Sequence, residues 1–263
     1  MLKTGHHLSD AEIRARYDAL PHRGGLGPEF LDRVLRLAGD LDGLTVLDLG
    51  CGRGELLAEI ARRHPRARLR GLDVSAVRAH AALRATGARA ALVGASAEAP
   101  PFRAGAFDRV FCTETLEHLK APERCVGEIA RLLAPGGRAI LTVPNATGFA
   151  PFHRLGRLVP GRWLRSKLLP YEHPANTDQP IDTCFTYGEI LALVRRGGLA
   201  IEAVAGWRYV RWLQMLPVAR TAYGWCAPTL ERLAPRLGGV RFAYNLLLRC
   251  RRAADGATRP PRP

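Results

Sequence analysis

Three glycines at alternate positions follow a carboxylate in this sequence, an arrangement that could hold a nucleotide-like cofactor against bare backbone. Asp48 lies in the apolar run 46–49 (VLDL), and Gly50, Gly52 and Gly54 follow it before a predicted helix. Because glycine has no Cβ, the chain can turn sharply there and its backbone can approach a ligand closely. The helix that follows would point the positive end of its dipole at that ligand.

Two carboxylates limit which cofactor fits this turn. Asp73 ends the second predicted strand, where an acidic residue can hydrogen-bond the ribose of NAD or of another adenosine cofactor. Asp48 lies inside an apolar strand, and burying a carboxylate is costly unless something pairs with it. A cationic ligand would offset that cost, and a local backbone hydrogen bond is the alternative. The spacing G-x-G-x-G is one residue short of the dinucleotide pattern, which disfavours an NAD-dependent oxidoreductase.

The elements that must position these residues alternate between strand and helix patterns, which predicts a parallel sheet covered by helices. Ser75 has the residue type and position of an N-cap for the helix that follows it. Strands are predicted at 44–49, 67–73, 90–93, 107–113, 139–143, 199–204 and 240–250. Helices are predicted at 55–64, 76–85, 122–133 and 187–196.

Five motifs in this order resemble those of the class I S-adenosylmethionine-dependent methyltransferases. They are 46–54 (VLDLGCGRG), 71–75 (GLDVS), 96–102 (SAEAPPF) with 107–110 (FDRV), 114–119 (ETLEHL) and 132–137 (LLAPGG). The ordered set is far more specific than any one motif. It implies a Rossmann-like, doubly wound α/β fold, with a mostly parallel seven-stranded sheet, helices on both faces and an antiparallel last strand.

By this resemblance the cofactor is S-adenosyl-L-methionine, and the glycine turn would hold its methionine end. The residues so implied are Asp48, Gly50, Cys51, Gly52 and Gly54.

The resemblance also implies contacts to the rest of the cofactor. Asp73 would accept the ribose hydroxyls, and Val74 would lie against the adenine. Ser96 and Ala97 would meet the adenine edge, although the family usually has Asp where Ser96 stands, so this contact would be weaker or made differently. Thr113 would line the cofactor near its sulfonium. In addition, Tyr17 resembles an N-terminal tyrosine that closes over the cofactor, with a surface position on a helix as the alternative.

His118 is the candidate general base for an acceptor hydroxyl, because it follows the fourth strand on the side of the sheet where ligands collect. Simple packing at the start of that loop is the alternative. Glu114, Glu117 and His118 also form an E-x-x-E-H group that resembles a metal-binding segment of some relatives, with His173 as a distant fourth ligand. Many relatives carry Glu-His here without a metal, so we predict none.

A single domain is predicted over 1–263, with a helical lead at 1–42, a cofactor-binding core at 43–145 and a frayed tail at 251–263. The segment 146–182 has no clean period and mixes basic with apolar residues. We predict that it forms a lid for an anionic or amphipathic acceptor. The second apolar insert, 207–239, is predicted to form a pocket wall or a dimer face, with contact at a membrane interface as the alternative.

The charge and cysteine composition limit the classes of partner and the cellular compartment that we expect. The formal net charge is +15, yet the positive residues are arginines spread along most of the chain, so we do not expect a nucleic-acid partner. The six cysteines include no C-x-x-C pair, and no signal-peptide pattern opens the chain. A cytoplasmic protein is expected, with peripheral contact at the inner membrane face as an extension of that expectation.

These patterns together predict a methyltransferase for a small-molecule or lipid-linked acceptor, with oxygen as the favoured atom. A catalytically inactive S-adenosylmethionine-binding regulator and a C-methyltransferase of a quinone-like acceptor are the alternatives. The sequence leaves the acceptor and the oligomeric state open.

Overall fold

Strands and helices alternate through the part of the chain that this computed structural model describes, residues 3–20, 25–149, 179–209, 225, 229, 232–237 and 239–254. The strands are β1 (Lys3–Thr4), β2 (Thr45–Leu49), β3 (Arg68–Asp73), β4 (Ala90–Gly94), β5 (Phe107–Thr113), β6 (Leu133–Pro144), β7 (Asp182–Thr183), β8 (Leu199–Trp207) and β9 (Asn245–Arg252). The helices are α1 (Asp10–Ala19), α2 (Pro28–Ala38), α3 (Glu55–Arg63), α4 (Ala76–Ala85), α5 (Pro122–Leu132) and α8 (Tyr187–Arg196). Short 3-10 segments are η1 (Leu116–His118), η2 (Ala146–Phe149), η5 (Ala234–Leu237) and η6 (Gly239–Phe242).

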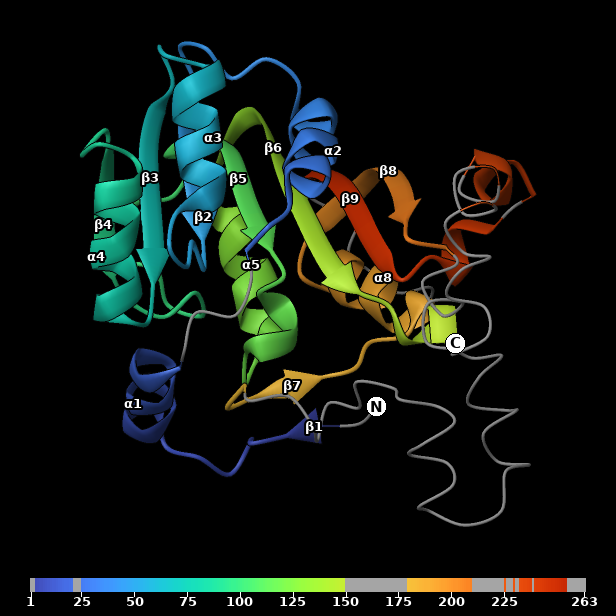
Figure 1. Cartoon of the computed structure of the whole chain (residues 1–263), viewed down its shortest axis with the longest axis horizontal. Helices are drawn as coiled ribbons and strands as arrows, with labels where there is room; N and C mark the ends of the chain where they lie inside the picture. The colour runs from blue at the N-terminus through green and yellow to red at the C-terminus, as the bar shows by residue number, and fades with distance from the viewer. Residues whose placement is uncertain are drawn as a thin grey trace.

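The main sheet has seven strands in the order β4-β3-β2-β5-β6-β9-β8 (Figure 1). Strands β4, β3, β2, β5 and β6 are parallel, whereas β9 is antiparallel to both of its neighbours. The predicted doubly wound, mostly parallel sheet with an antiparallel last strand is therefore confirmed.

Successive side chains of each strand enter two different cores, one on each face of the sheet. In β5, Val110 packs in the core that contains Ile129 of α5, while the adjacent Phe111 packs with Val34 of α2 and Ile60 of α3. Both cores consist of fully buried aliphatic and aromatic side chains. This two-sided burial explains why the sequence of β2 is almost entirely apolar, with Asp48 as its one charged residue.

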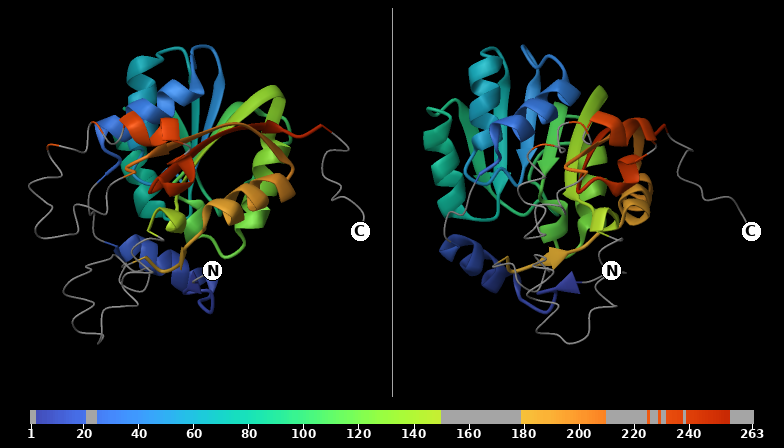
Figure 2. Two further views of the ribbon diagram at one scale, coloured as in Figure 1. Left: turned by 90° about the vertical axis from the view of Figure 1, so that its right-hand side faces the viewer. Right: turned by 45° about the vertical axis from the view of Figure 1, so that its right-hand side comes forward.

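A third and smaller apolar cluster lies beyond the carboxyl ends of the parallel strands. It consists of Leu8, Ile13, Tyr17 and Ile181. In Figure 1, α1, β1 and β7 lie below the sheet, in the direction in which the arrowheads of β3 and β6 point, and both views of Figure 2 keep α1 there. The two-residue strands β1 and β7 pair antiparallel and form a second sheet, which the sequence analysis did not predict.

Several predicted boundaries differ from the structure. Strand β9 begins at Asn245 rather than at residue 240, because 239–242 form the 3-10 segment η6. Arg251 and Arg252 belong to β9, where they pair with β8, so these two residues of the predicted frayed tail are ordered by the sheet. Trp207 is the last residue of β8, so the second insert begins after it.

Most of the predicted lid and much of the second insert lie outside the described residues, which omit 150–178 and 210–224. His153 and His173 fall in the first of these ranges. The acceptor-lid prediction for 146–182 and the apolar-insert prediction for 207–239 stay predictions. None of the helices in the described part of the chain has the length and apolar character that a membrane crossing requires.

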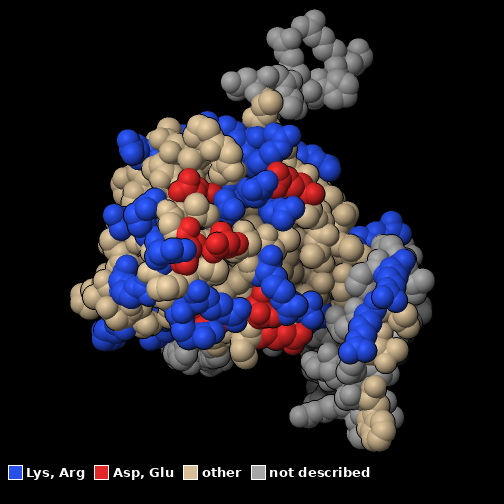
Figure 3. All heavy atoms as spheres, turned by 90° about the horizontal axis from the view of Figure 1, so that it is seen from above, with Lys and Arg blue, Asp and Glu red and all other residues tan. Residues whose placement is uncertain are grey.

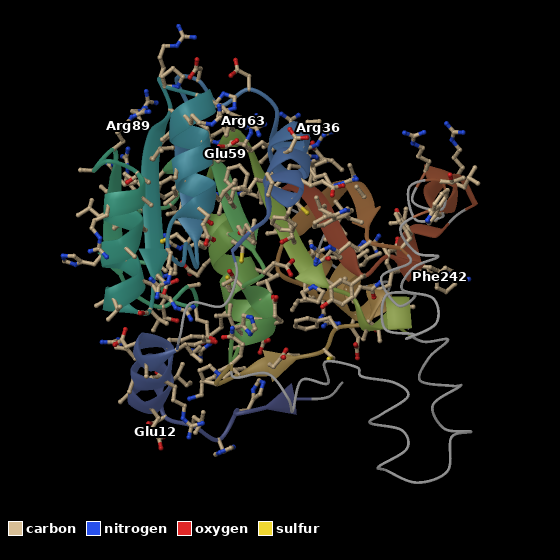
Figure 4. The ribbon with its side chains drawn as sticks, viewed as in Figure 1. Glu12, Arg36, Glu59, Arg63, Arg89 and Phe242 are labelled. Carbon is tan, nitrogen blue, oxygen red and sulfur yellow. The ribbon has the colours of Figure 1, made fainter. Side chains whose placement is uncertain are left out.

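Arginine side chains gather at the end of the molecule opposite α1, where Figure 3 shows them interleaved with acidic residues. Glu59 accepts hydrogen bonds from Arg62 and Arg63, and Asp32 accepts them from Arg36 and Arg63. Figure 4 labels Arg36, Glu59 and Arg63 at that end, far from Glu12 on α1. Much of the positive charge on this face is therefore locally paired, although exposed pairs of this kind each contribute little to stability.

Candidate active site

A pocket opens at the carboxyl ends of β2 to β5, between the sheet and the N-terminal segment. Residues of α1 and Ile181 line one side of the pocket, and residues that follow β2, β3, β4 and β5 line the other. This is the edge at which open α/β sheets bind their ligands. The third apolar cluster belongs to the α1 side of the pocket, and Val74, which follows β3, packs against it from the sheet side.

The glycine turn after β2 requires glycine at both of its ends. Gly50 has a φ of 76°, and a Cβ built there would lie 2.5 Å from the side chain of Thr115. Gly54 has a φ of 83°, and its Cβ would lie 2.7 Å from Ala82 of α4. The amides of Gly50 and Cys51 both donate to the carbonyl of Leu72, so the turn is tied to the end of β3. Gly50 itself lines the pocket.

Asp73, at the end of β3, lines the pocket and is braced by two backbone amides. Its Oδ2 accepts from Gly52 N at 2.9 Å and its Oδ1 accepts from Ser75 N at 2.8 Å. Each carboxylate oxygen can accept a second hydrogen bond, so the group can still receive ligand hydroxyls. Burial raises the pKa of Asp73, while these two amides and Arg78 act in the opposite direction. The arrangement fits a ribose diol.

Asp48 is fully buried, and its Oδ1 has no hydrogen-bond partner among the described residues. Burial raises its pKa to about 8, and the nearby carboxylates of Asp73 and Glu55 add to this shift. The predicted local backbone hydrogen bond to this atom is thus not found. An unpaired carboxylate directly before the glycine turn fits a site for a positively charged ligand group.

The structure brings together six of the predicted site residues on the pocket wall. These are Gly50, Asp73, Val74, Ser96, Ala97 and His118. The other five do not line the pocket: Asp48, Cys51, Gly52, Gly54 and Thr113.

The side chains of two predicted cofactor-binding residues, Cys51 and Ser96, already contact other parts of the protein. The side chain of Cys51 is buried in the core beside Gly71, so only its backbone faces the turn. Ser96 Oγ accepts a hydrogen bond from Glu98 N at 3.2 Å, which leaves its hydroxyl hydrogen to meet a ligand.

His118 lies in η1, directly after β5, and its Nδ1 is 2.9 Å from the carbonyl oxygen of Ile181. A carbonyl oxygen only accepts, so Nδ1 must carry a proton, and Nε2 of the neutral ring has a free lone pair. Burial lowers the pKa of His118. The Ile181 hydrogen bond and Asp182 act in the opposite direction, and Arg78 lowers it further. A neutral imidazole with an available Nε2 is the form that a general base requires.

In the E-x-x-E-H group, Glu117 Oε1 lies 3.9 Å from His118 Nε2, whereas the Glu114 carboxylate is engaged elsewhere. Glu114 turns toward β6 and β9, where Oε1 accepts from Thr142 Oγ1 at 2.9 Å and Oε2 from Asn245 Nδ2 at 3.1 Å. Glu117 is buried, and burial together with Glu114 raises its pKa well above the usual range. In the described part of the chain, no group of His, Cys, Asp and Glu is arranged to hold a metal ion. His173 lies outside that part.

The α1 side of the pocket was largely missed by the sequence analysis, which singled out Tyr17 alone. Ile13 and Arg14 of α1 also line the pocket, and the Tyr17 ring lies under the guanidinium of Arg78 at 5.0 Å. The Tyr17 hydroxyl is buried and has no hydrogen-bond partner among the described residues, and burial raises its pKa. A sequence signal was present, because Ser9 and Glu12 form a capping box that marks the start of α1.

Polar contacts attach α1 to the rim of the pocket. Lys120 Nζ lies 3.0 Å from Asp10 Oδ1, and Ser75 Oγ donates to Asp18 Oδ1 at 2.5 Å. Ser75 also accepts from Arg78 N, which confirms its predicted role as the N-cap of α4.

The fold and this site together fit an enzyme of the doubly wound α/β class whose ligand carries a ribose and a positively charged group. A family model described as "Methyltransferase domain" matches residues 47–141. The ubiquinone biosynthesis O-methyltransferase of Xanthomonas oryzae pv. oryzae (strain PXO99A) is 32% identical over 203 residues, which cover 71% of this chain and 75% of the relative. The relative of the same name in Sodalis glossinidius (strain morsitans) is 36% identical over 143 residues, covering 51% of this chain and about half (53%) of the relative.

Among solved structures, the geranyl diphosphate C-methyltransferase of Streptomyces coelicolor A3(2) superposes with a TM-score of 0.60 at 16% identity. The match covers 93% of this chain and 98% of that one, whose structure contains Mg²⁺, geranyl diphosphate and S-adenosyl-L-homocysteine. Such low identity shows the shared fold alone.

The chain belongs to the class I S-adenosylmethionine-dependent methyltransferases. It is an enzyme of that family, and its cofactor is S-adenosyl-L-methionine. The unpaired Asp48 carboxylate, the glycine turn and the braced Asp73 all fit this cofactor, which carries positive charge and a ribose diol.

Proposed function

We propose that the chain transfers a methyl group to a hydroxyl oxygen of a small, amphipathic acceptor, with His118 as the general base. The observation that carries this proposal is the neutral His118 ring, which lines the same pocket as Gly50 and Asp73 with Nε2 unprotonated. The names of the curated relatives support oxygen as the methylated atom and an acceptor related to ubiquinone biosynthesis.

The cofactor contacts follow from the pocket wall. We infer that Asp73 binds the ribose hydroxyls, and that Val74, Ser96 and Ala97 contact the adenine. The turn that begins at Gly50 would hold the methionine end through its backbone. Asp48, Cys51, Gly52, Gly54 and Thr113 would support it from behind.

When bound, S-adenosyl-L-methionine supplies an electrophilic methyl group on a sulfonium. The protein must then hold the acceptor oxygen in line and remove its proton. His118 Nε2 can accept that proton, which contributes roughly 10²–10⁴-fold when a base is well placed. Ile13, Tyr17 and Ile181 cover the pocket with apolar surface and exclude water from it.

The proposal for the acceptor-binding part of the site involves segments that lie largely outside the described residues. We infer that 146–182 closes over an amphipathic acceptor and that the chain makes peripheral contact with a membrane where that acceptor resides. Arg14 and Arg78 on the pocket rim support an acceptor with anionic character. A small molecule rather than a nucleic acid is the proposed partner.

The test is to incubate the purified chain with methyl-labelled S-adenosylmethionine and a panel of hydroxylated aromatic compounds with apolar tails. Each compound is paired with an analogue whose hydroxyls are already blocked. A methoxy product, identified by mass spectrometry and NMR, with no transfer to the blocked partner, supports the proposal. A product carrying the label on carbon would overturn it in favour of C-methylation.

A further inference from the structure

The contact that fixes the His118 ring comes from a distant part of the chain. Ile181, whose carbonyl oxygen lies 2.9 Å from His118 Nδ1, immediately precedes β7. Strand β7 is held by β1, with Thr183 opposite Lys3 and Asp182 opposite Thr4. The orientation of the Ile181 peptide therefore depends on the first residues that the structure describes.

Gly5 makes this pairing sterically feasible. Its φ is +72°, and a Cβ built on it would lie 1.7 Å from the carbonyl oxygen of Pro180 and 3.3 Å from Cα of Ile181. Backbone atoms cannot move aside as the end of a flexible side chain can. Any residue larger than glycine must push the peptide between Pro180 and Ile181 away from β1.

Other contacts hold the same peptide in place. His6 Nε2 lies 3.1 Å from Thr183 Oγ1, and Leu8 N donates to Gly5 O at 3.0 Å. The Ile181 side chain is buried against Leu8 and Ile13. The peptide before β7 is thus packed between the N-terminal turn and η1.

We propose that Gly5, through the β1–β7 pair, positions His118 for proton abstraction by holding the Ile181 carbonyl against Nδ1. The inference rests on the proposed role of His118 as the base. Gly5 touches neither the acceptor nor the cofactor, so it acts as a positioning residue.

The protons and electron pairs balance as follows. The acceptor O–H bond breaks and its proton forms a bond to His118 Nε2, while the oxygen forms a bond to the methyl carbon. The pair of the breaking C–S bond returns to sulfur. The resulting imidazolium keeps its Nδ1–H bond to Ile181 O and later releases the Nε2 proton to water.

Among the described residues, the Ile181 carbonyl is the hydrogen-bond acceptor seen for His118 Nδ1, and it keeps the ring proton there. A ring protonated at Nε2 cannot accept the hydroxyl proton there. The other charged groups that act on His118 are Asp182 and Arg78, and Glu117 Oε1 lies 3.9 Å from Nε2. Because burial raises the pKa of Glu117, the Ile181 hydrogen bond is the contact that sets which ring nitrogen carries the proton.

The test is the tautomer itself, read by two-bond ¹H–¹⁵N NMR on the full chain with ¹⁵N-labelled histidine. The chain has eight histidines, and His118→Asn assigns the signal. We expect the wild-type His118 proton on Nδ1 and a shift toward Nε2 in Gly5→Ala. Gly43→Ala is the matched control, because Gly43 has a φ of +77° but nothing within 4 Å of its added Cβ. It should leave the tautomer unchanged.

Activity provides the second readout. Gly5→Ala should lower kcat by about tenfold or more, up to the roughly 10²–10⁴-fold that a general base contributes, and leave the affinity for S-adenosylhomocysteine unchanged. If Gly5→Ala does not fold, Thr183→Val, which removes the His6 contact, should shift the tautomer partially. A wild-type proton on Nε2 overturns the inference, as does an unchanged tautomer in every variant that folds. If His118→Asn retains full turnover, the base assignment fails, while the tautomer still decides the role of Gly5.

Discussion

The two walls of the pocket are built in different ways. On the sheet side, neighbouring elements supply the contacts, as when Gly50 and Cys51 donate to Leu72 and Asp73 accepts from Gly52. On the N-terminal side, the contacts join segments far apart in sequence, as when His6 meets Thr183 across 177 positions. The cofactor wall is encoded locally, whereas the wall that orients the base is assembled only when distant segments meet.

The two walls also differ in how strongly they are held. Strands β2, β3 and β5 each pair with two neighbouring strands, and β2 is buried on both faces. The N-terminal side has the small cluster around Ile181 and polar contacts such as Lys120–Asp10, in which the Asp10 side chain is 87% exposed. Exposed ion pairs contribute about 0–1 kcal/mol each, so we expect this side to open at a lower free-energy cost than the sheet.

The largest expected effect tests whether His118 acts in catalysis without contributing to cofactor binding. His118→Asn should lower kcat by roughly 10²–10⁴-fold and leave the calorimetric affinity for S-adenosylhomocysteine unchanged. In the wild type, burial places the His118 pKa below its ordinary value, so the rate should fall only as pH drops below about 6.5. An equal loss of cofactor affinity would show that His118 contributes to cofactor binding instead.

The next effect concerns the cofactor wall alone. Asp73→Asn loses charged hydrogen bonds of about 1.5–3 kcal/mol, so S-adenosylhomocysteine should bind roughly 10- to 150-fold more weakly by calorimetry. Asp108→Asn is the matched control, because Asp108 Oδ2 also accepts a backbone amide, from Thr45 at 2.8 Å, but at the opposite edge of the sheet. Equal losses in both variants would mean that the effect is one of general stability.

A third prediction concerns the free-energy cost of keeping the Asp48 carboxylate buried and charged. Its pKa of about 8 in the folded state lies above that in the unfolded chain, so the folded state binds a proton that the unfolded state has released. Stability is therefore present at low pH and is lost as pH rises toward 8. From about pH 6 to about pH 8, wild type should lose about 1–3 kcal/mol relative to Asp48→Asn in urea unfolding. Parallel stability curves would contradict this.

The smallest effect tests the contact between the two walls. Ser75→Ala and Thr186→Ala each remove an N-cap, of α4 and α8, at a cost of about 1 kcal/mol of unfolding free energy. Only Ser75 also donates to Asp18 of α1, so only its variant should speed hydrogen exchange in residues 10–19. Equal exchange rates in the two variants would show that this contact does not hold α1 in place.

Local sequence signals predicted the cofactor wall well. The strand over 107–113 has the bounds of β5, and Ser75 caps α4 as its residue type suggested. The glycine turn was predictable because only glycine tolerates positive φ beside Thr115 and Ala82. The pair β1–β7 was not predictable, since two-residue strands have no periodicity to detect.

The role of each predicted residue depended more on tertiary structure. Asp48 directly precedes the turn and Thr113 ends β5, yet neither residue lines the pocket. Glu114 matched a metal-ligand spacing, but its carboxylate is hydrogen-bonded to Thr142 and Asn245. Spacing along a chain does not specify side-chain direction at a 3-10 turn, where packing of several elements decides it.

The sequence by itself indicated the family through the resemblance of five ordered motifs, which also marked the acidic positions of the site. It determined the order of strands and helices along the chain and the position of the glycine turn, because these follow from hydrophobic periodicity and backbone sterics. Only the tertiary structure decided which nitrogen of His118 is free, because that depends on a carbonyl 63 residues away. It also decided that Gly5 must be glycine, since the clashing Pro180 carbonyl reaches it only through the β1–β7 pairing. Local rules encode the cofactor wall, while long-range contacts position the proposed base.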